Sequence, residues 1–252
     1  NAMNVLMDLF QNPDLVPDRA FLIESLNDMK EDEMHIAERY ARVRILETIG
    51  QGSRLEFIHR IFQEGGGEIS DVFLSNLKTA THDIIKKFQI HMLLDYATQI
   101  KRSEAFYTAM HFSNLLKVSA FESVRNTAGV GLIRLIDELT FEQRNDIVIE
   151  LLRALEMESY QFTRYIPEYL GKIILSVKPK ELDEILDDFK DKMKRSNAQI
   201  GMLIAKTVGV MIRNYGVYKV VYGEPEEQYR ERLYIMLGIL LNGLVSFIPS
   251  VT

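Results

Sequence analysis

A step of 38 residues relates three segments of the sequence and constrains the fold more than any other feature. Within each segment, apolar residues recur three and four positions apart, which is the period of a helix with one buried face. A fixed period of this length is typical of proteins built from repeated helical units. Six positions correspond in the three segments: Val124, Ala128, Leu132, Leu135, Ile136 and Leu139; Phe162, Ile166, Leu170, Ile173, Ile174 and Val177; Ile200, Ile204, Val208, Met211, Ile212 and Tyr215.

A second helix repeats at the same step. Its apolar positions are Ile147, Val148, Leu151 and Leu155, followed by Ile185, Leu186, Phe189 and Met193. Each unit is therefore expected to be a helix of about 17 residues, a tight turn and a second such helix, which must stack on neighbours to bury its apolar face. Gly171 and Gly209 coincide at this step, and we expect both to admit a closely packed neighbouring helix. Gly129 and Gly131 are expected to pack helices too, because Arg134 stands where a dinucleotide fingerprint requires its third glycine.

Helix starts are also marked in the sequence. A Ser or Thr followed three residues later by Glu or Gln can form a reciprocal capping box. Pro179 suits a first helical position. The linkers between these marks are short, which predicts that successive helices pack antiparallel. The predicted boxes are Ser53/Glu56, Ser119/Glu122, Thr140/Gln143 and Ser196/Gln199.

The composition favours helix and sets limits on partners. The chain has 6 prolines, 14 glycines and no cysteine, so it forms no disulfide and no thiolate metal site. A formal charge of −6 gives no overall basic field for nucleic acid or anionic lipid. We therefore expect a cytoplasmic protein whose main partner is neither nucleic acid nor a membrane. The most apolar run, Leu233 to Ile248, contains Asn242 and is short for a membrane span, so it predicts a buried helix.

The paired-helix units from Ser119 to Tyr215 resemble the HEAT and armadillo-like class of helical repeats, including Pro167 inside its helix, a common kink position in that class. The resemblance implies an all-α fold, a right-handed α-α superhelix (α-solenoid) of antiparallel helix pairs with about 10 to 12 helices. An earlier degenerate pair is predicted at Ala41 to Ile49 and Ser53 to Gln63.

One repeat domain is expected to fill the chain from residue 3 to 252, after a tag remnant at residues 1–2. Its clearest repeats are 119–215, with degenerate pairs in 18–117 and a terminal helix at 226–247. Gly216 to Pro225 interrupts the period and predicts an inserted loop or short strand pair. The terminal helix is apolar nearly all round, whereas a terminal repeat normally has a polar outer face. We expect either that the chain is part of a longer protein or that it self-associates through 226–247.

Aromatic and basic residues gather near the second repeat. Tyr165 and Tyr169 fall outside the repeating apolar set and lie beside Arg164 and Lys172. In the class that the chain resembles, this helix lines the concave surface, and aromatic and Arg side chains contribute much of the energy of protein interfaces. These four residues are the candidate partner-binding site. The alternative is that the tyrosines pack between units with their hydroxyls in water.

A His-Asp pair offers a catalytic alternative. His82, Asp83 and Ile84, with His59 upstream, resemble the signature of HD-type metal-dependent phosphohydrolases, although Ile85-Lys86 replaces the usual Gly-Lys. The resemblance implies a metal site at His59, His82 and Asp83. The other interpretation is that Asp83 opens a helix, where a carboxylate is stabilised by the helix dipole. His91 and Asp95 have a spacing that could share an ion, but hydrogen bonding is the expected role.

Taken together, these features favour a non-catalytic protein-interaction or regulatory scaffold that needs no cofactor and binds a protein or another domain of its own chain. A phosphohydrolase using His82 and Asp83 is the first alternative. Nucleic-acid binding through a basic groove is the second. Its candidate residues are Lys86, Lys87, Lys101, Arg102, Arg125 and Arg164.

Overall fold

The computed structural model describes residues 19–30, 34, 36–64, 83–157 and 163–247, and every regular element in these ranges is a helix. The all-α prediction is therefore confirmed for the described residues. The chain divides into two units, Asn1–Thr108 and Ala109–Thr252. We describe each unit by itself.

The first unit contains α2 (Arg19–Asn27), α3 (Ile36–Thr48), α4 (Arg54–Glu64) and α6 (Asp83–Asp95). A π-helical turn, η3 (Tyr96–Ile100), and a 3-10 turn, η4 (Arg102–Glu104), follow α6. Helix α3 packs against α4 and α6. The degenerate helix pair expected in this region is thus present as α3 and α4.

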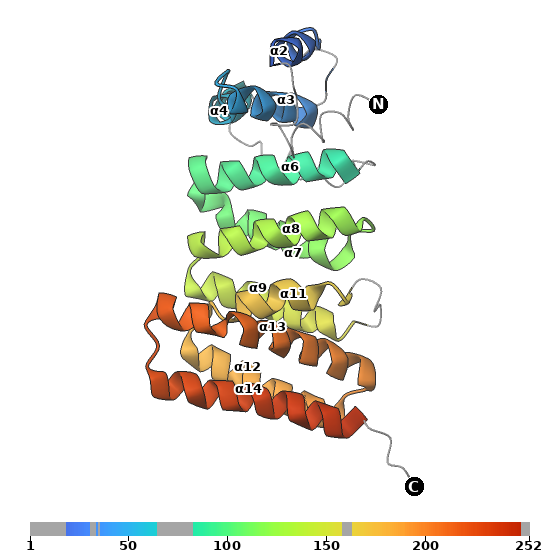
Figure 1. The fold of residues 1–252 in the computed structure, drawn as a ribbon, viewed down its shortest axis with the longest axis vertical. Helices are drawn as coiled ribbons and strands as arrows, with labels where there is room; N and C mark the ends of the chain where they lie inside the picture. Colours follow the sequence, from blue (N-terminus) through green and yellow to red (C-terminus); the bar gives the residue numbers. More distant parts are fainter. Residues whose placement is uncertain (1–18, 31–33, 35, 65–82, 158–162, 248–252) are drawn as a thin grey trace. The chain divides into compact units, whose positions relative to one another are not determined.

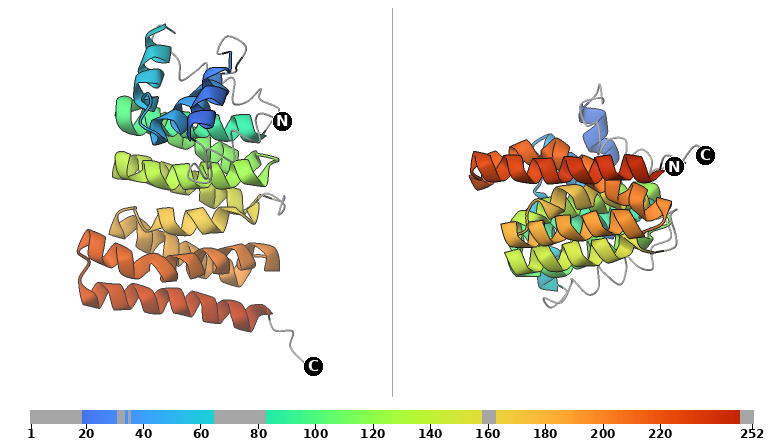
Figure 2. Two further views of the ribbon diagram at one scale, coloured as in Figure 1. Left: turned by 45° about the horizontal axis from the view of Figure 1, so that its top comes forward. Right: turned by 90° about the horizontal axis from the view of Figure 1, so that it is seen from below.

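The second unit is a series of packed helices. Helix α7 (Ala105–Val118) begins shortly before the unit boundary at Ala109. The elements that follow it are α8 (Glu122–Leu135), η5 (Ile136–Glu138), α9 (Phe141–Leu155), α11 (Ile166–Ile174), α12 (Pro179–Arg195), α13 (Ala198–Tyr222) and α14 (Glu226–Phe247). Helix α8 packs against α11 and α11 against α13, while α14 packs against both α12 and α13. Figure 1 shows α8, α11, α13 and α14 following one another in chain order, and Figure 2 shows α13 and α14 side by side.

Most of the residues that repeat at 38-residue steps lie in the core of the second unit. All the corresponding positions in α8, α9 and α12 are buried, as are those of the second segment from Ile166 onward. Phe162 lies outside the described residues. In α13, Ile204, Val208, Met211 and Tyr215 are buried, whereas Ile200 and Ile212 are only half-buried. The repeat therefore predicted the buried faces of these helices.

Glycine permits close helix packing at two positions. A Cβ on Gly129 would stand 2.5 Å from the ring of Tyr169, and one on Gly171 would stand 2.6 Å from the Cβ of Val210. The packing roles predicted for these two glycines are confirmed. The expectation for Gly209 is wrong, because the nearest atom to a Cβ there would be Nη1 of Arg213, 3.9 Å away on the same helix.

The predicted capping boxes are partly present. Thr140 and Gln143 form a full box at the start of α9, and the amide of Glu56 donates to Ser53 Oγ over 3.3 Å. Pro179 is the first residue of α12, as predicted. Two boxes are wrong. The residue before α8 is Phe121 and not Ser119, and α13 is capped by Asn197, whose Oδ1 accepts from the amide of Ile200 over 2.9 Å.

Two further expectations are corrected. The segment 216–222 is neither a loop nor a strand pair, because α13 continues to Tyr222 and ends at Gly223, which has a φ of 63°. The helix tolerates Gly216 because an interior glycine costs only about 1 kcal/mol, which tertiary contacts can offset. Pro167 does not kink a helix; it lies in the first turn of α11, where its missing N–H would have no intrahelical partner.

Candidate protein-interaction site

A hollow lies between α11, the residues just before it, and α13; we call it the α11–α13 groove. Its volume is about 470 Å³. The floor is small and apolar, because Pro167 and Val210 are buried and Gly209 has no side chain. The lining residues are Arg164, Pro167, Glu168, Met202, Ala205, Lys206, Gly209, Val210 and Arg213.

Cationic side chains dominate the rim of the groove. Arg164, Lys206 and Arg213 are cationic, and Glu168 is the only acidic residue among those that line it. Glu168 already pairs with Lys172, at 2.9 Å, and lies 3.7 Å from Arg213. The groove is therefore locally positive on a chain whose formal charge is −6. Such a local potential favours an anionic occupant.

Arg164 is held in place by Tyr165, the residue immediately before α11. The guanidinium of Arg164 lies 4.7 Å from the ring centroid, and Nη2 donates to the phenol oxygen over 2.5 Å. Tyr165 in turn donates to Oε2 of Glu122 on α8 over 2.9 Å, and Arg125 lies 4.2 Å from the ring centroid. The guanidinium groups of Arg125 and Arg164 both make cation–π contacts with the Tyr165 ring, and these contacts fix the position of the ring. Tyr165 therefore holds the guanidinium of Arg164, a residue that lines the groove.

The other two candidate residues lie differently. Tyr169 is buried between α8 and α11 and donates to Oδ1 of Asn126 over 2.9 Å, and its burial raises the pKa of its hydroxyl. The expectation that its ring is presented in a groove is wrong, because Gly129 leaves a gap on α8 that the ring fills. Lys172 does not line the groove, but it forms an ion pair with Glu168, which does. A role of these four residues in partner binding stays a prediction.

Sequence reasoning missed the α13 side of the groove. Met202, Lys206, Gly209 and Arg213 are spaced four, three and four residues apart, so they share one face of α13. Apart from Met202, that face lacks the large apolar residues of the buried face, and the helical period alone could have identified it. What the period could not show is that Arg164, from another segment, lies beside it.

A second hollow, of about 310 Å³, lies where α13 turns into α14. Tyr215, Tyr218 and Tyr222 line it, and the last two rings stack with centroids 5.5 Å apart. Tyr218 donates to the carbonyl of Lys172 over 2.9 Å. Burial, together with the neighbouring Tyr222 and Asp137, raises the pKa of Tyr218 to about 12.

Beside this hollow, Arg232 joins three acidic and aromatic side chains. It donates from Nε and Nη2 to the two carboxylate oxygens of Asp183, over 2.7 and 3.1 Å, and it also pairs with Glu224. Tyr215 donates to Glu224 over 2.8 Å. Because Arg232 is buried, these bonds satisfy a charge that would otherwise be costly. We interpret this group as structural.

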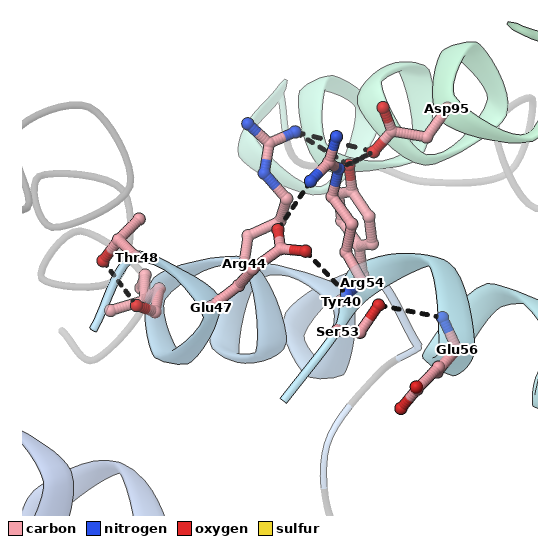
Figure 3. Close-up of polar contacts among 9 residues, drawn as sticks. Tyr40, Arg44, Glu47, Thr48, Ser53, Arg54, Glu56 and Asp95 are labelled. Carbon is pink, nitrogen blue, oxygen red and sulfur yellow. Dashed lines mark hydrogen bonds and ion pairs between the residues drawn. The ribbon is translucent and has the colours of Figure 1, made fainter. Parts of the chain in front are cut away.

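The first unit has its own polar network, drawn in Figure 3. The carboxylate of Asp95 accepts from the Tyr40 hydroxyl over 2.5 Å and from Arg54 Nε over 3.0 Å, with Arg44 at 3.6 Å. Arg54 also donates to Glu47 over 2.7 Å. The hydrogen-bonding role expected for Asp95 is confirmed.

The residues of the proposed metal site are only partly described. His59 is exposed on α4, Asp83 is the first residue of α6, and His82 lies outside the described residues. Asp83 lies in the first turn of α6, where the second interpretation expects a carboxylate. Within the described ranges, no group of three His, Asp or Glu side chains could hold a metal ion. The phosphohydrolase alternative stays untested.

The candidate nucleic-acid residues fall in both units. Lys86, Lys87, Lys101 and Arg102 belong to the first, and Arg125 and Arg164 to the second. Arg125 is 4% exposed and donates to the carbonyl of Ser119, so it cannot contribute to a basic surface.

Comparisons with known proteins leave the function open. The chain matches no family model, and no curated protein and no solved structure is significantly similar to it. Among the described helices, none has a stretch long and apolar enough to cross a membrane.

Proposed function

We propose that this chain is a cytoplasmic, non-catalytic interaction module, whose second unit is a HEAT-like α-solenoid with the α11–α13 groove as its binding surface. Two findings support a solenoid: the buried positions recur at the 38-residue step, and α8, α11 and α13 pack in succession. The occupant of the groove is an acidic segment of a partner protein or of another domain of the same chain.

The observation that carries this proposal is the combination of a cationic rim with an open apolar floor. Arg164 and Arg213 come from different helical segments and both line the hollow, so they can pair with separate carboxylates of one bound segment. Gly209 leaves the floor open to the backbone of that segment. Met202, which is 39% exposed, offers an adaptable apolar contact.

The proposal is tested with short synthetic peptides and methionine methyl NMR. The probe is a peptide that alternates Glu and Leu, and the comparison is a peptide of equal length that alternates Lys and Leu. We expect the acidic peptide to shift the methyl resonance of Met202, and the basic peptide to leave it unchanged. Met157, which is also exposed but does not line the groove, serves as the internal control.

Matched charge reversals complete the test. Arg164→Glu combined with Arg213→Glu should abolish the Met202 shift, whereas Arg230→Glu, at an exposed position on α14, should preserve it. Equal responses to both peptides, or a shift that survives the double reversal, would contradict the groove assignment. The circular dichroism of each variant shows whether the fold is retained.

A further inference from the structure

Helix α14 carries an exposed apolar stripe. Tyr234, Leu237, Leu241 and Leu244 are 71%, 40%, 62% and 63% exposed, and they are spaced three, four and three residues apart. The buried residues of the same helix are Arg232, Met236, Ile239 and Gly243. At 3.6 residues per turn, the two sets lie on opposite faces of α14. One face therefore packs on α12 and α13, and the stripe points away from them.

The stripe is free of charge along its length. No Asp, Glu, Lys or Arg occurs between Leu233 and Phe247. On the same face, the apolar character begins after Arg230, which pairs with Glu226 over 3.0 Å. Figure 1 shows α14 as the last helix of the second unit, with no other described helix of that unit beyond it.

The spacing of the stripe is symmetric, because three, four and three read the same in both directions. If a second copy of α14 is laid antiparallel on the first, Tyr234 stands opposite Leu244 and Leu237 opposite Leu241. A twofold interface requires this reciprocity, in which residue i meets j and j meets i. The same spacing is that of the a and d positions of a coiled coil, which pack as knobs into holes.

We propose that two copies of this chain associate through antiparallel packing of their α14 helices, with the twofold axis between Leu237 and Leu241. A second copy is the occupant that the stripe fits best, since it supplies a complementary row in the same register. An uncharged row offers no ionic feature by which a different partner would be selected. Gly238, beside the stripe, has no atom within 4 Å of the position of a Cβ, so a partner helix can approach there.

The size of the stripe predicts a weak dimer. Its four side chains expose on the order of 400 Å² per protomer, comparable to the largest apolar patch of an ordinary monomer. Two such stripes would bury about 800 Å² in total, less than the roughly 1,200 Å² at which stable protein interfaces begin. The association should therefore depend on concentration and dissociate on dilution.

Sedimentation velocity over a concentration series tests the association. We expect the native chain to shift from monomer to dimer, and Leu241→Glu to weaken the association about a hundredfold, because a carboxylate would be buried without a partner. The matched control is Val220→Glu, on α13, where a 79% exposed side chain lies outside the stripe and should leave the dimer unchanged. A monomer at every concentration, or an equal effect of the two substitutions, would overturn the proposal.

The register is tested by cross-linking, for which the chain is suited because it has no cysteine. Protein carrying Leu237→Cys is mixed with protein carrying Leu241→Cys and oxidised. An antiparallel pair should give the mixed disulfide faster than either variant alone gives its own, whereas the reverse order would show parallel helices and refute the register. Neither experiment involves the α11–α13 groove, so the two proposals stand or fall separately.

Discussion

The hydroxyl of Tyr40, fully buried on α3, donates a 2.5 Å hydrogen bond to the carboxylate of Asp95 at the end of α6, 55 residues away. This bond joins two helices of the first unit that share a core. Tyr40→Phe keeps the ring but removes the donor, so we expect the free energy of unfolding to fall by about 1 to 2 kcal/mol. Urea denaturation followed by circular dichroism measures the change.

The same substitution at an exposed tyrosine provides the control. Tyr234 is 71% exposed, and its hydroxyl makes no hydrogen bond with a described residue. At concentrations that keep the chain monomeric, Tyr234→Phe should leave the unfolding free energy unchanged. Equal stability of the Tyr40→Phe variant and the native protein would show that the buried bond makes no net contribution.

Alkaline pH should destabilise the protein through its buried tyrosines. Burial raises the pKa of Tyr40 above its ordinary value, and burial likewise raises that of Tyr218 to about 12. Above about pH 10 an unfolded tyrosine loses its proton while the folded one keeps it, so the native state binds more protons and stability falls as pH rises. The stabilisation that comes from the raised pKa of Tyr218 is fully present below about pH 10 and is lost by about pH 12.

Unfolding curves measured from neutral pH up to the alkaline limit of the assay would check this dependence. Tyr218→Phe removes one titrating group, so its stability should decline less steeply than that of the native protein. Parallel declines in the two proteins would mean that Tyr218 titrates normally.

Two glycines that the repeat treats as equivalent should respond oppositely to alanine. In Gly171→Ala the new methyl would meet Val210 at 2.6 Å and the carbonyl oxygen of Thr207 at 2.8 Å, so α11 and α13 must separate. Overpacking of this kind costs about 1 to 3 kcal/mol. In Gly209→Ala there is space, and helix propensity should add up to about 1 kcal/mol. Thermal or urea unfolding of both variants gives the comparison, and destabilisation by both would refute the assigned packing.

Arg232 should matter far more than its neighbour Arg230. Arg232→Met leaves Glu224, whose side chain is 12% exposed, without its cationic partner, and we expect a loss of about 2 to 4 kcal/mol. Arg230→Met removes an exposed pair with Glu226 and should change stability by less than about 0.5 kcal/mol. Chemical denaturation of the two variants in parallel measures both effects. Similar losses would mean that burial does not govern these ion pairs.

Helical periodicity predicted the buried faces well, because each apolar position reports directly on the side of the helix that meets the core. Val124 and Leu170 are examples, both fully buried. Local chemistry was less reliable. Ser119 fits the capping pattern, but the residue before α8 is Phe121. The Ser119 hydroxyl accepts from the Phe121 amide and its carbonyl accepts from Arg125.

Residues whose role depends on a distant segment could not be predicted. Gly216 and Gly223 look alike in the sequence, yet α13 passes through the first and ends at the second. The hydrogen bond from Tyr218 to Lys172, 46 residues away, is one contact that favours continuing the helix. The same limit applies to the groove, because Arg164 and Arg213 line one hollow but share no local sequence pattern.

The fit of the Tyr169 ring over Gly129 sets the position of α11 along α8. A displacement of α11 by one turn would bring the ring against Arg125 or Ile133, which have side chains where Gly129 has none. Sliding between these two helices is therefore blocked in both directions. Between α8 and α11, the motion left open by this contact is rotation about the tyrosine ring.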